Sequence, residues 1–483
     1  MCRNRDVGVL QTLYLTFMKH FVFISCLFFT GVAFSQEIKN VQLLDHWFSD
    51  TLLTSSSQVR FSSCWAFVQN GREYGVIGST EGAHIFELTE QDSFKFIDFV
   101  PGRFQSAQVI TREYKHYQNF LYATCDEGSS SLQIIDLSHL PDSVHLAADL
   151  QDQYFGKSHN LFIDSANALL YLTLVNPIVN GNELGIIPLR VYSLANPILP
   201  ALLWEGPNDL PEVHDLFVKD NRAILNCGFD GIRTYDFSNP SNPVYVNNLT
   251  FYPQQGYNHQ GWLSPNGSTY VFADETAGLP IKKCGISANG QIQVKQFFGT
   301  ENAPYLKTPH NIHITNEFAF VAYYNDGLRI FDLRKNPPQE IGVYDTYIDN
   351  AQTNGFSMWG AWGIHALLPS ERILISDRNN GFFLFEFDRS KFLIPSTENV
   401  QLYPNPSSVG ENVFVRLPND EVTEFSINVV DAKGDLLAEL EVQQQSFENL
   451  PIDLAAGCYF VRVTWTNYLG ESQTEMLKWV KYD

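Results

Sequence analysis

The stretch Asp230-Gly-Ile-Arg-Thr-Tyr-Asp236 and the stretch Asp326-Gly-Leu-Arg-Ile-Phe-Asp332 repeat each other at a distance of 96 residues. Each stretch follows a histidine by the same 16 residues, His214 in the first copy and His310 in the second. A third histidine, His259, lies between them, 45 and 51 residues from its neighbours. A fixed period near 50 residues indicates one supersecondary unit that has been copied, with neighbouring copies packed against each other.

The repeated unit has the pattern of four short antiparallel strands. In the clearest copy the strand candidates are residues 311–314, 319–324, 328–333 and 340–344. Asp326-Gly327 joins the second strand to the third, because glycine tolerates the positive φ of a tight hairpin turn. Four strands per copy at this period predict an all-β fold, a β-propeller of about seven blades, within residues 36–392. Counts of six and eight blades stay open, because the first two copies are degenerate.

Composition narrows the classes of function. The chain has 483 residues, of which 44% are hydrophobic and 14% aromatic, and its formal net charge is −22. A strongly acidic chain repels nucleic acid and anionic membrane surfaces, so we expect neither as a partner. Five cysteines follow residue 35 without a disulfide framework, and Cys125 and Cys227 lie in apolar runs, as buried thiols do.

The N-terminus has the pattern of a signal peptide. Lys19 precedes an apolar run over residues 21–34, and Ala33-Phe34-Ser35 fits a small-x-small cleavage site. The run is shorter than the roughly 20 residues that a membrane-spanning helix needs. We therefore expect residues 1–35 to be a cleaved signal peptide, with Met18 as an alternative start, and no transmembrane segment after cleavage. A retained membrane anchor is the alternative.

The last part of the chain differs in kind from the repeats. Residues 393–399 are short and contain a proline, which is typical of a linker. Residues 400–483 contain short runs of alternating residue types, which predict a small β-sandwich.

This tail resembles the type A sorting domain of the type IX secretion system of Bacteroidota. The matching residues, in order along the chain, are Tyr403, Pro404, Asn405, Pro406, Gly457, Lys478 and Lys481. The resemblance implies that the secretion machinery of the outer membrane reads the tail and that the tail is usually removed. It implies a protein that is secreted or held on the outer-membrane surface of a Gram-negative cell. An accessory carbohydrate-binding sandwich is the alternative, although the tail lacks a visible aromatic platform.

The propeller resembles the choice-of-anchor B family, whose blades are LVIVD-type repeats. The residues that carry the resemblance are Ser158-His159-Asn160, Val213-His214-Asp215, Asn258-His259-Gln260-Gly261-Trp262, Ala273-Asp274-Glu275, Pro309-His310-Asn311 and Gly360-Ala361-Trp362-Gly363. The resemblance covers nearly all of residues 58–390, the part of the chain that the tail would export. The early Trp-Arg-acidic motif of the family is missing, since Arg103-Phe104-Gln105-Ser106 stands near that place. The family is named for its varied surface anchors and implies no established activity.

The recurring histidines are candidate metal ligands. Each opens the first strand of a repeat, and in a propeller the first strand lines the central channel. We expect His214, His259 and His310, together with Asp274, to be able to hold a divalent metal there, since imidazole and carboxylate groups bind such ions. The alternative is a hydrogen-bonding device, copied in every blade, that ties each strand to the backbone of its neighbour.

Two acids and two tryptophans are candidate ligand-binding residues. Asp274 and Glu275 form an acidic turn that no glycine follows directly, which sets them apart from the other acidic turns. Trp262 and Trp362 belong to the same group of repeats, and aromatic faces at a propeller mouth stack on sugars. Ordinary turn chemistry and core packing are the alternatives for these two pairs.

The sequence contains no nucleophile elbow, zinc-protease His-Glu pair, phosphate-binding glycine loop or Cys-x-x-Cys motif. No catalytic residue is therefore assigned, and whether the protein is an enzyme stays open. The favoured interpretation is an exported propeller that binds a glycan or a protein partner. The alternatives are a metal-dependent hydrolase or lyase at the channel and a structural surface or adhesion component. Histidines and carboxylates that converge in one pocket would favour the enzyme, and an exposed aromatic or polar patch the binding module.

Overall fold

The computed structural model describes residues 36–482 with short gaps at 55, 288, 301–306, 348–357, 393–399, 411–412, 418–423, 444–446, 451–453 and 467–471. The expected signal peptide, residues 1–35, and the expected linker, residues 393–399, lie outside the described residues. Among the residues described, no helix has the length and apolar character needed to cross a membrane.

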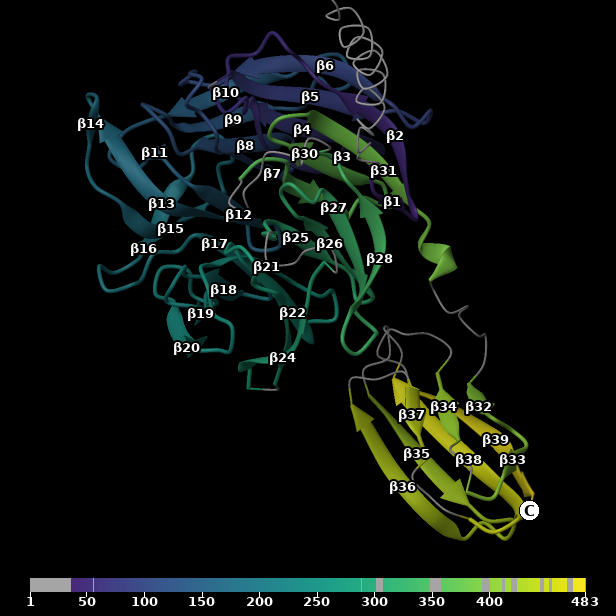
Figure 1. The fold of residues 1–483 in the computed structure, drawn as a ribbon. Coiled ribbons are helices and arrows are strands. Elements are labelled where there is room, and N and C mark those ends of the chain that lie inside the picture. Colours follow the sequence, from purple (N-terminus) through teal and green to yellow (C-terminus); the bar gives the residue numbers. More distant parts are fainter. Residues whose placement is uncertain are drawn as a thin grey trace, which may run out of the picture. The chain divides into compact units, whose positions relative to one another are not determined.

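Residues 38–387 form a β-propeller. Within the described residues, seven antiparallel sheets of four or more strands surround one axis, and we number them as blades I to VII in chain order (Figure 1). In each blade the first strand is innermost, and the later strands pair with one another in sequence order toward the outside. The predicted propeller is confirmed, with seven as the number of its blades.

Blades I to IV follow one another along the chain. Blade I contains β3 (Phe61–Gln69), β4 (Arg72–Ser79), β5 (Gly82–Leu88) and β6 (Phe94–Pro101). Blade II contains β7 (Arg112–Tyr117), β8 (Phe120–Cys125), β9 (Leu132–Asp136) and β10 (His145–Leu150). Blade III contains β12 (Asn160–Asp164), β13 (Leu169–Val179), β15 (Ile187–Ser193) and β16 (Ala201–Glu205), with the short β11 (Gly156–Lys157) and β14 (Asn182–Glu183) on β13. Blade IV contains β17 (Asp215–Lys219), β18 (Arg222–Asn226), β19 (Ile232–Asp236) and β20 (Val244–Leu249).

Blades V to VII complete the ring. Blade V contains β21 (Asn258–Leu263), β22 (Thr269–Asp274), β23 (Ile281–Ile286) and β24 (Ile292–Phe298). Blade VI contains β25 (Ile312–Ile314), β26 (Phe318–Ala322), β27 (Leu328–Asp332) and β28 (Gln339–Tyr344). Blade VII contains β29 (Ala361–His365), β30 (Ile373–Asp377) and β31 (Gly381–Phe387), after which comes the short 3-10 helix η3 (Arg389–Lys391).

The N-terminal strands close the ring. Strand β2 (Val41–Trp47) is the outer strand of blade VII and pairs antiparallel with β31, with Val41 opposite Phe387. Strand β1 (Ile38–Lys39) adds a fifth strand to blade VI by pairing with β28. Because β2 and β31 stand at opposite ends of the propeller sequence, their hydrogen bonds join the first and last parts of the ring.

The Asp-Gly turns take the conformation that the repeat predicts. Gly231 and Gly327 both have a φ of +73°, a region that L side chains rarely adopt. A Cβ atom on Gly231 would lie 2.3 Å from the Leu249 carbonyl oxygen, and one on Gly327 would lie 2.2 Å from that of Tyr344. Both carbonyls belong to the outer strand of the same blade, so glycine is required at this place in the two copies.

The equivalent turn of blade VII is built on a buried carboxylate. Asp377, which is fully buried, accepts hydrogen bonds from the backbone N–H groups of Asn379 and Asn380 and from the Thr346 hydroxyl. Burial raises the pKa of Asp377 to about 6, from an ordinary value of 3.8. The turn therefore stabilises the fold best when this carboxyl group carries its proton.

The hydrophobic core lies between the faces of neighbouring blades. The rings of Phe94 and Phe382 stack 4.7 Å apart where blade I meets blade VII, and those of Tyr344 and Phe385 are 4.6 Å apart where blade VI meets blade VII. Blade VII thus buries apolar side chains against the blades on both sides of it, as expected of a copied unit. The five cysteines in the described residues are free thiols, and only Cys458 is not fully buried.

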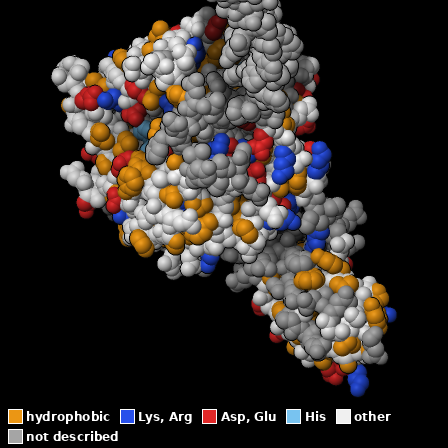
Figure 2. Space-filling model, viewed as in Figure 1, with side chains coloured by type: hydrophobic (Ala, Val, Ile, Leu, Met, Phe, Trp, Pro, Cys, Tyr) orange, Lys and Arg blue, Asp and Glu red, His pale blue; other side chains and the backbone are white. Residues whose placement is uncertain are grey.

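The tail is a small β-sandwich, as predicted. One sheet contains β32 (Gln401–Tyr403), β34 (Phe414–Arg416) and β37 (Phe447–Asn449). The other contains β33 (Ser407–Ser408), β39 (Ser472–Tyr482), β38 (Gly457–Thr466), β35 (Glu424–Val430) and β36 (Leu436–Gln443). Its core contains Val415, Ile427 and Trp479, and the Trp479 indole donates to the Ser407 hydroxyl at 2.9 Å. On the face drawn in Figure 2, hydrophobic side chains lie in separate groups among polar ones.

Deletion of residues 36–47 tests the ring closure. The deletion removes β2 and exposes the edge of β31, so we expect a broad unfolding transition at a melting temperature several degrees lower, since a difference of about 1 kcal/mol shifts the midpoint by a few degrees. Deletion of residues 36–40 is the control, because it removes β1 and leaves all of β2. Equal melting temperatures for the two deletions would contradict the assignment of β2 as the closing strand.

Asp377→Asn tests the buried carboxylate. Between pH 4 and pH 6 the folded protein holds a proton that the unfolded chain has released, so this group's contribution to stability is full below about pH 4 and falls as the pH rises through 6. We expect the variant to match the wild type at pH 4 and to exceed it at pH 8 by roughly 1–3 kcal/mol. Chemical denaturation at both values measures this. Asp220→Asn, in an exposed turn, should show no such difference between the two values.

Candidate functional site

Aromatic side chains from five successive blades form a row at the centre of the propeller. His159, His214, His259 and His310 stand at the start of the innermost strands of blades III to VI, and Trp362 takes the same place in blade VII. The centroids of successive rings along this row are 4.1, 4.3, 4.2 and 4.0 Å apart. The four imidazoles and the indole ring, which we call the channel row, are therefore in continuous contact across the blades.

Two histidines of the channel row tie their blade to the next one. Nδ1 of His214 lies 3.2 Å from the carbonyl oxygen of His259, and Nδ1 of His310 lies 2.7 Å from that of Trp362. A carbonyl oxygen only accepts, so Nδ1 carries the hydrogen in both rings. The hydrogen-bonding device expected as the alternative to metal binding thus occurs at these two histidines. His159 differs, since its Nδ1 contacts the Asp126 carboxylate at 2.8 Å.

The buried histidines of the channel row are neutral at neutral pH. Burial lowers the pKa of His214 and His310 well below the ordinary value, and it lowers the pKa of His259 to about 4. Burial also acts to lower the pKa of His159, but the hydrogen bond and the charge of Asp126 outweigh it, so this pKa is raised. His159, at one end of the row, is therefore the imidazole of the row that favours the charged form.

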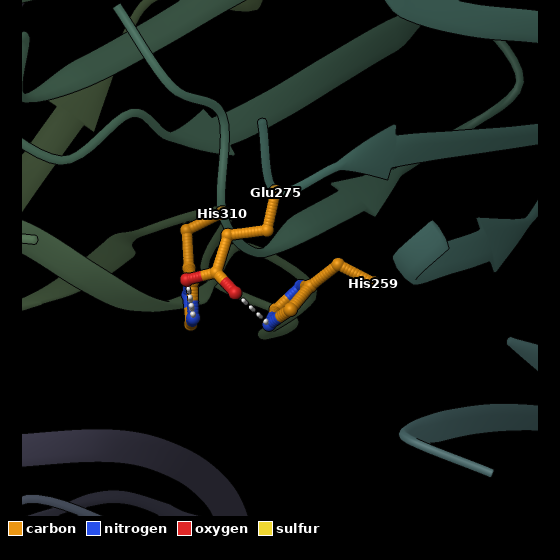
Figure 3. Close-up of side chains that lie close together, drawn as sticks. All are labelled: His259, Glu275 and His310. Atoms are coloured by element: carbon orange, nitrogen blue, oxygen red, sulfur yellow. Dashed lines mark ion pairs between the residues drawn. The ribbon is translucent and has the colours of Figure 1, made fainter. Parts of the chain in front are cut away.

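Two imidazoles of the channel row converge with one carboxylate (Figure 3). His259 comes from β21, His310 lies two residues before β25, and Glu275 directly follows β22. The Glu275 carboxylate lies between the two rings, with one oxygen 3.9 Å from Nε2 of His259 and the other 3.9 Å from Nε2 of His310. The three ligand atoms lie within 4.8 Å of one another, which is the spacing of a candidate metal site.

Asp274, expected as the carboxylate of this site, points elsewhere. Its two oxygens accept hydrogen bonds from Lys282 Nζ at 2.7 Å, from the Tyr252 hydroxyl at 2.8 Å and from the Gly256 N–H at 2.7 Å. The carboxylate is fully buried and its acceptor capacity is used inside blade V. Successive side chains of a strand point to opposite sides, so Glu275, one residue later, is the acid that reaches the histidines. His214 stacks on His259 but is not part of the three-residue cluster.

The two candidate tryptophans occupy different layers. Trp362 ends the channel row, with the Cζ atom of Arg378 4.2 Å from its ring centroid. Trp262 lies three residues further along its strand than His259, in a second layer formed by Trp65, Phe162, Phe217, Trp262, His313 and His365. Trp262 lies 4.0 Å from His313 and 4.8 Å from Phe217, measured between ring centroids. The structure therefore does not bring Trp262 and Trp362 together as one sugar-stacking platform.

Sequence reasoning missed this second layer, although the chain carries a signal for it. An aromatic or histidine residue follows each member of the channel row by three residues, as in His214-Asp-Leu-Phe217, His310-Asn-Ile-His313 and Trp362-Gly-Ile-His365. Neighbouring first strands lie side by side, so a motif at a constant spacing places a second set of rings below the first. Rings of this second layer contact one another between neighbouring blades, from Phe162 to Trp65.

The sorting-motif residues, which are far apart in sequence, meet in the tail. The Asn405 side chain donates to the Lys478 carbonyl oxygen at 2.6 Å and accepts from the Val480 N–H at 3.1 Å. Gly457, at the start of β38, lies opposite Lys481 of β39. Asn405 thus holds the segment that contains Pro404 and Pro406 against the C-terminal strand. Tyr403 stands at the end of β32 with its side chain partly exposed.

The chain is therefore a seven-bladed propeller with a separate β-sandwich tail that carries a sorting motif. Comparison with protein families identifies the tail: the secretion system C-terminal sorting domain matches residues 401–474. The protein is exported by the type IX secretion pathway, to be secreted or displayed at the cell surface. No curated protein matches the chain in sequence.

Solved structures resemble the chain only distantly. The WD40 repeats of RRP9 align with a TM-score of 0.48 and 10% identity over 73% of this chain and all of that one. A protein from Lactobacillus plantarum aligns with a TM-score of 0.46 and 14% identity over 77% of this chain and 95% of that one. The extracellular domain of BT4673 from B. thetaiotaomicron gives 0.43 and 12% over 91% of this chain and 59% of that one. The propeller assignment therefore rests on the chain's own sheet order.

Asn405→Ala tests whether the tail's geometry matters for export. The substitution removes two hydrogen bonds to the C-terminal strand, each worth roughly 1 kcal/mol. We expect the full chain with this change to accumulate in the periplasm of a host with the type IX system, as does a chain that lacks residues 400–483. Cell fractionation and immunoblotting measure the distribution. Lys433→Ala, in an exposed turn, should be exported like the wild type, and equal export of Asn405→Ala would contradict the expectation.

Proposed function

We propose that the exported propeller is a binding module that takes a glycan partner through an aromatic patch at the loops of blades IV and V. The observation that carries the proposal is a pair of exposed phenylalanines. Phe229, between β18 and β19, is 76% exposed, and Phe251, after β20, is 86% exposed. Large apolar rings so open to water in a soluble exported chain are typical of surfaces that bind a partner.

Hydrogen bonds hold the two loops of the patch together. The Gln255 side chain donates to the carbonyl oxygens of Phe229 at 3.1 Å and of Thr250 at 3.2 Å, so it spans both loops. The Tyr257 ring packs edge-on against Phe229 at 5.2 Å, and its hydroxyl donates to the Glu212 carboxylate. Aromatic faces beside amide, hydroxyl and carboxylate groups suit a sugar, which has apolar faces and polar edges.

The patch and the channel row are connected. Tyr257 also contacts the His214 ring, at 5.3 Å and nearly perpendicular. His214 is fixed in turn by its hydrogen bond to blade V, so one side of the patch stands on the rigid centre of the propeller. Binding surfaces that are held in place before the partner arrives lose less conformational entropy on binding.

Two finer assignments accompany this proposal. The repeats around His159, His214, His259 and His310 support membership of the propeller in the choice-of-anchor B family. The sorting tail supports display on the outer-membrane surface of a Bacteroidota-type cell, with the expected signal peptide over residues 1–35 and the domain boundaries at 392 and 400. A protein partner in place of a glycan remains an outcome of the binding test.

A metal-dependent hydrolase or lyase is the second candidate function, favoured by the convergence of His259, Glu275 and His310. The two imidazoles are nearly inaccessible and the Glu275 side chain is 13% exposed, so the described residues give a substrate little access to the cluster. The exposed aromatic patch is accessible, which is why binding is the favoured function.

The double variant Phe229→Ala/Phe251→Ala tests the binding function. Both rings are exposed, so we expect an unchanged melting temperature and at least a tenfold loss of affinity, about 1.4 kcal/mol, for the glycan that the wild-type chain retains. A glycan array followed by calorimetry on the exported chain makes the measurement. Phe96→Ala, an exposed phenylalanine on the outer strand of blade I, is the matched control. A wild-type chain that retains no glycan, or a double variant that binds as well as the control, would refute the proposal.

A further inference from the structure

We propose that His259, Glu275 and His310 bind one divalent transition-metal ion, of which zinc is the representative, between blades V and VI. The three side chains come from two neighbouring blades and point toward one another (Figure 3). This inference does not rest on the glycan-binding function, because the cluster shares no residue with the aromatic patch.

The His310 ring is held in the tautomer that a metal ligand needs. Its Nδ1 donates to the Trp362 carbonyl oxygen at 2.7 Å, so in the neutral ring Nε2 carries a lone pair and no hydrogen. Nε2 is buried and has no hydrogen-bond partner in the described part of the chain. Histidines that bind metals usually donate their other ring N–H to a carbonyl or carboxylate in this manner. Nε2 of His310 thus has a free lone pair for a metal ion, on the side of the ring that faces the Glu275 carboxylate.

Glu275 and His259 are the other two ligands of the cluster, and a neighbouring side chain orients Glu275. The Tyr324 hydroxyl donates to one oxygen of Glu275, and the Tyr324 ring packs edge-on against His310 at 4.9 Å. Tyr324 therefore orients the carboxylate, as the outer groups of metal sites do. Nδ1 of His259 is buried and has no hydrogen-bond partner among the described residues, so either nitrogen of its neutral ring is able to carry the hydrogen.

The separations of the three ligand atoms are close to those around a metal ion. One Glu275 oxygen lies 3.9 Å from Nε2 of His259, and the other lies 3.9 Å from Nε2 of His310. These distances are too long for hydrogen bonds and leave room for an ion between the groups. A tetrahedral zinc ion with bonds of about 2.1 Å holds its ligand atoms roughly 3.4 Å apart. The three ligand atoms lie within 4.8 Å of one another, so an approach of up to about 1.4 Å between them meets this geometry. Two imidazoles and one carboxylate favour zinc and its neighbours over calcium or magnesium, which take oxygen ligands.

The charges around the cluster and the number of its ligands determine how it would hold an ion. Glu275 brings one negative charge, and the Arg378 guanidinium, which lies over Trp362, interacts electrostatically with the same carboxylate. That positive charge opposes a cation, so we expect an affinity below that of structural zinc sites. Three protein ligands leave a fourth position, which in zinc proteins is taken by water or by a group of a bound molecule.

Zinc titration of the exported chain without a histidine tag tests the proposal. After chelator dialysis and removal of the chelator, we expect one zinc ion per chain and a rise of several degrees in melting temperature. Cobalt in place of zinc serves as a spectroscopic probe, and visible absorption bands of four-coordinate cobalt with nitrogen and oxygen ligands are the expected result. A wild-type chain that holds no stoichiometric zinc would overturn the proposal.

Matched variants assign the site. Glu275→Gln keeps an acceptor for the Tyr324 hydroxyl and removes the charge, and His259→Gln removes one imidazole; we expect each to bind zinc at least tenfold more weakly and to lose the cobalt bands. His159→Gln changes an imidazole of the same channel row outside the cluster and should bind like the wild type. If His259→Gln fails to fold, the nearly isosteric Glu275→Gln decides. Zinc bound equally by the wild type and Glu275→Gln would be adventitious and would overturn the assignment.

Discussion

The hydrogen bonds between β2 and β31 are the constraint on which the propeller depends. Each blade buries its apolar faces against two neighbours, so an open ring would leave one face of blade I and one of blade VII in water. The centre inherits this constraint, because the channel row runs over the first strands of five blades with ring centroids 4.0–4.3 Å apart. A ring that opens by even one ångström between blades V and VI would separate His259 from His310. Closure at the N-terminus therefore positions side chains more than 200 residues away.

Much of this fold follows from the sequence, and the reason is the copy number. The Asp-Gly turns at 230–231 and 326–327 predict the hairpins correctly, because a carbonyl of the outer strand leaves no room for a Cβ at Gly231 or Gly327. Repetition also predicts that the histidines share one level of the channel. It does not predict which acid joins them, because both acids stand at the end of β22 and only their contacts in the folded chain tell them apart. Asp274 accepts hydrogen bonds from Lys282, Tyr252 and Gly256, and Glu275 reaches the two imidazoles. Phe229 lies in the copied Asp-Gly turn, at a place where the other copy has Asn325, and Phe251 follows β20. Repetition therefore predicts the turn but not the phenylalanines.

The two interpretations of the histidines, blade linkage and metal binding, concern different nitrogens of the same rings. In His310, Nδ1 bonds to the next blade, and that bond leaves Nε2 without a hydrogen. The contact that stabilises the ring of blades thus also creates the free donor atom. An imidazole used only as a link would need no carboxylate at Nε2, and His214 is such a case, since no acid joins it in the cluster. Glu275 is therefore the residue that separates a linking histidine from a candidate ligand.

The residue that follows the second strand explains why the cluster forms at one junction. One position of the second strand lies opposite the first strand in the same way in four blades, and it is occupied by Asn226, Ala273, Ala322 and Ser376 in blades IV to VII. Two residues further along the chain, these blades have Gly228, Glu275, Tyr324 and Arg378, in the same order. Gly228 has no side chain to offer His214, and Arg378 places a cation over Trp362. Of these four blades, only blade V supplies a carboxylate, and Tyr324 of blade VI donates its hydroxyl to that group. The copied backbone thus presents the same position in each blade, and the identity of one side chain per blade decides whether the channel row links, packs or binds.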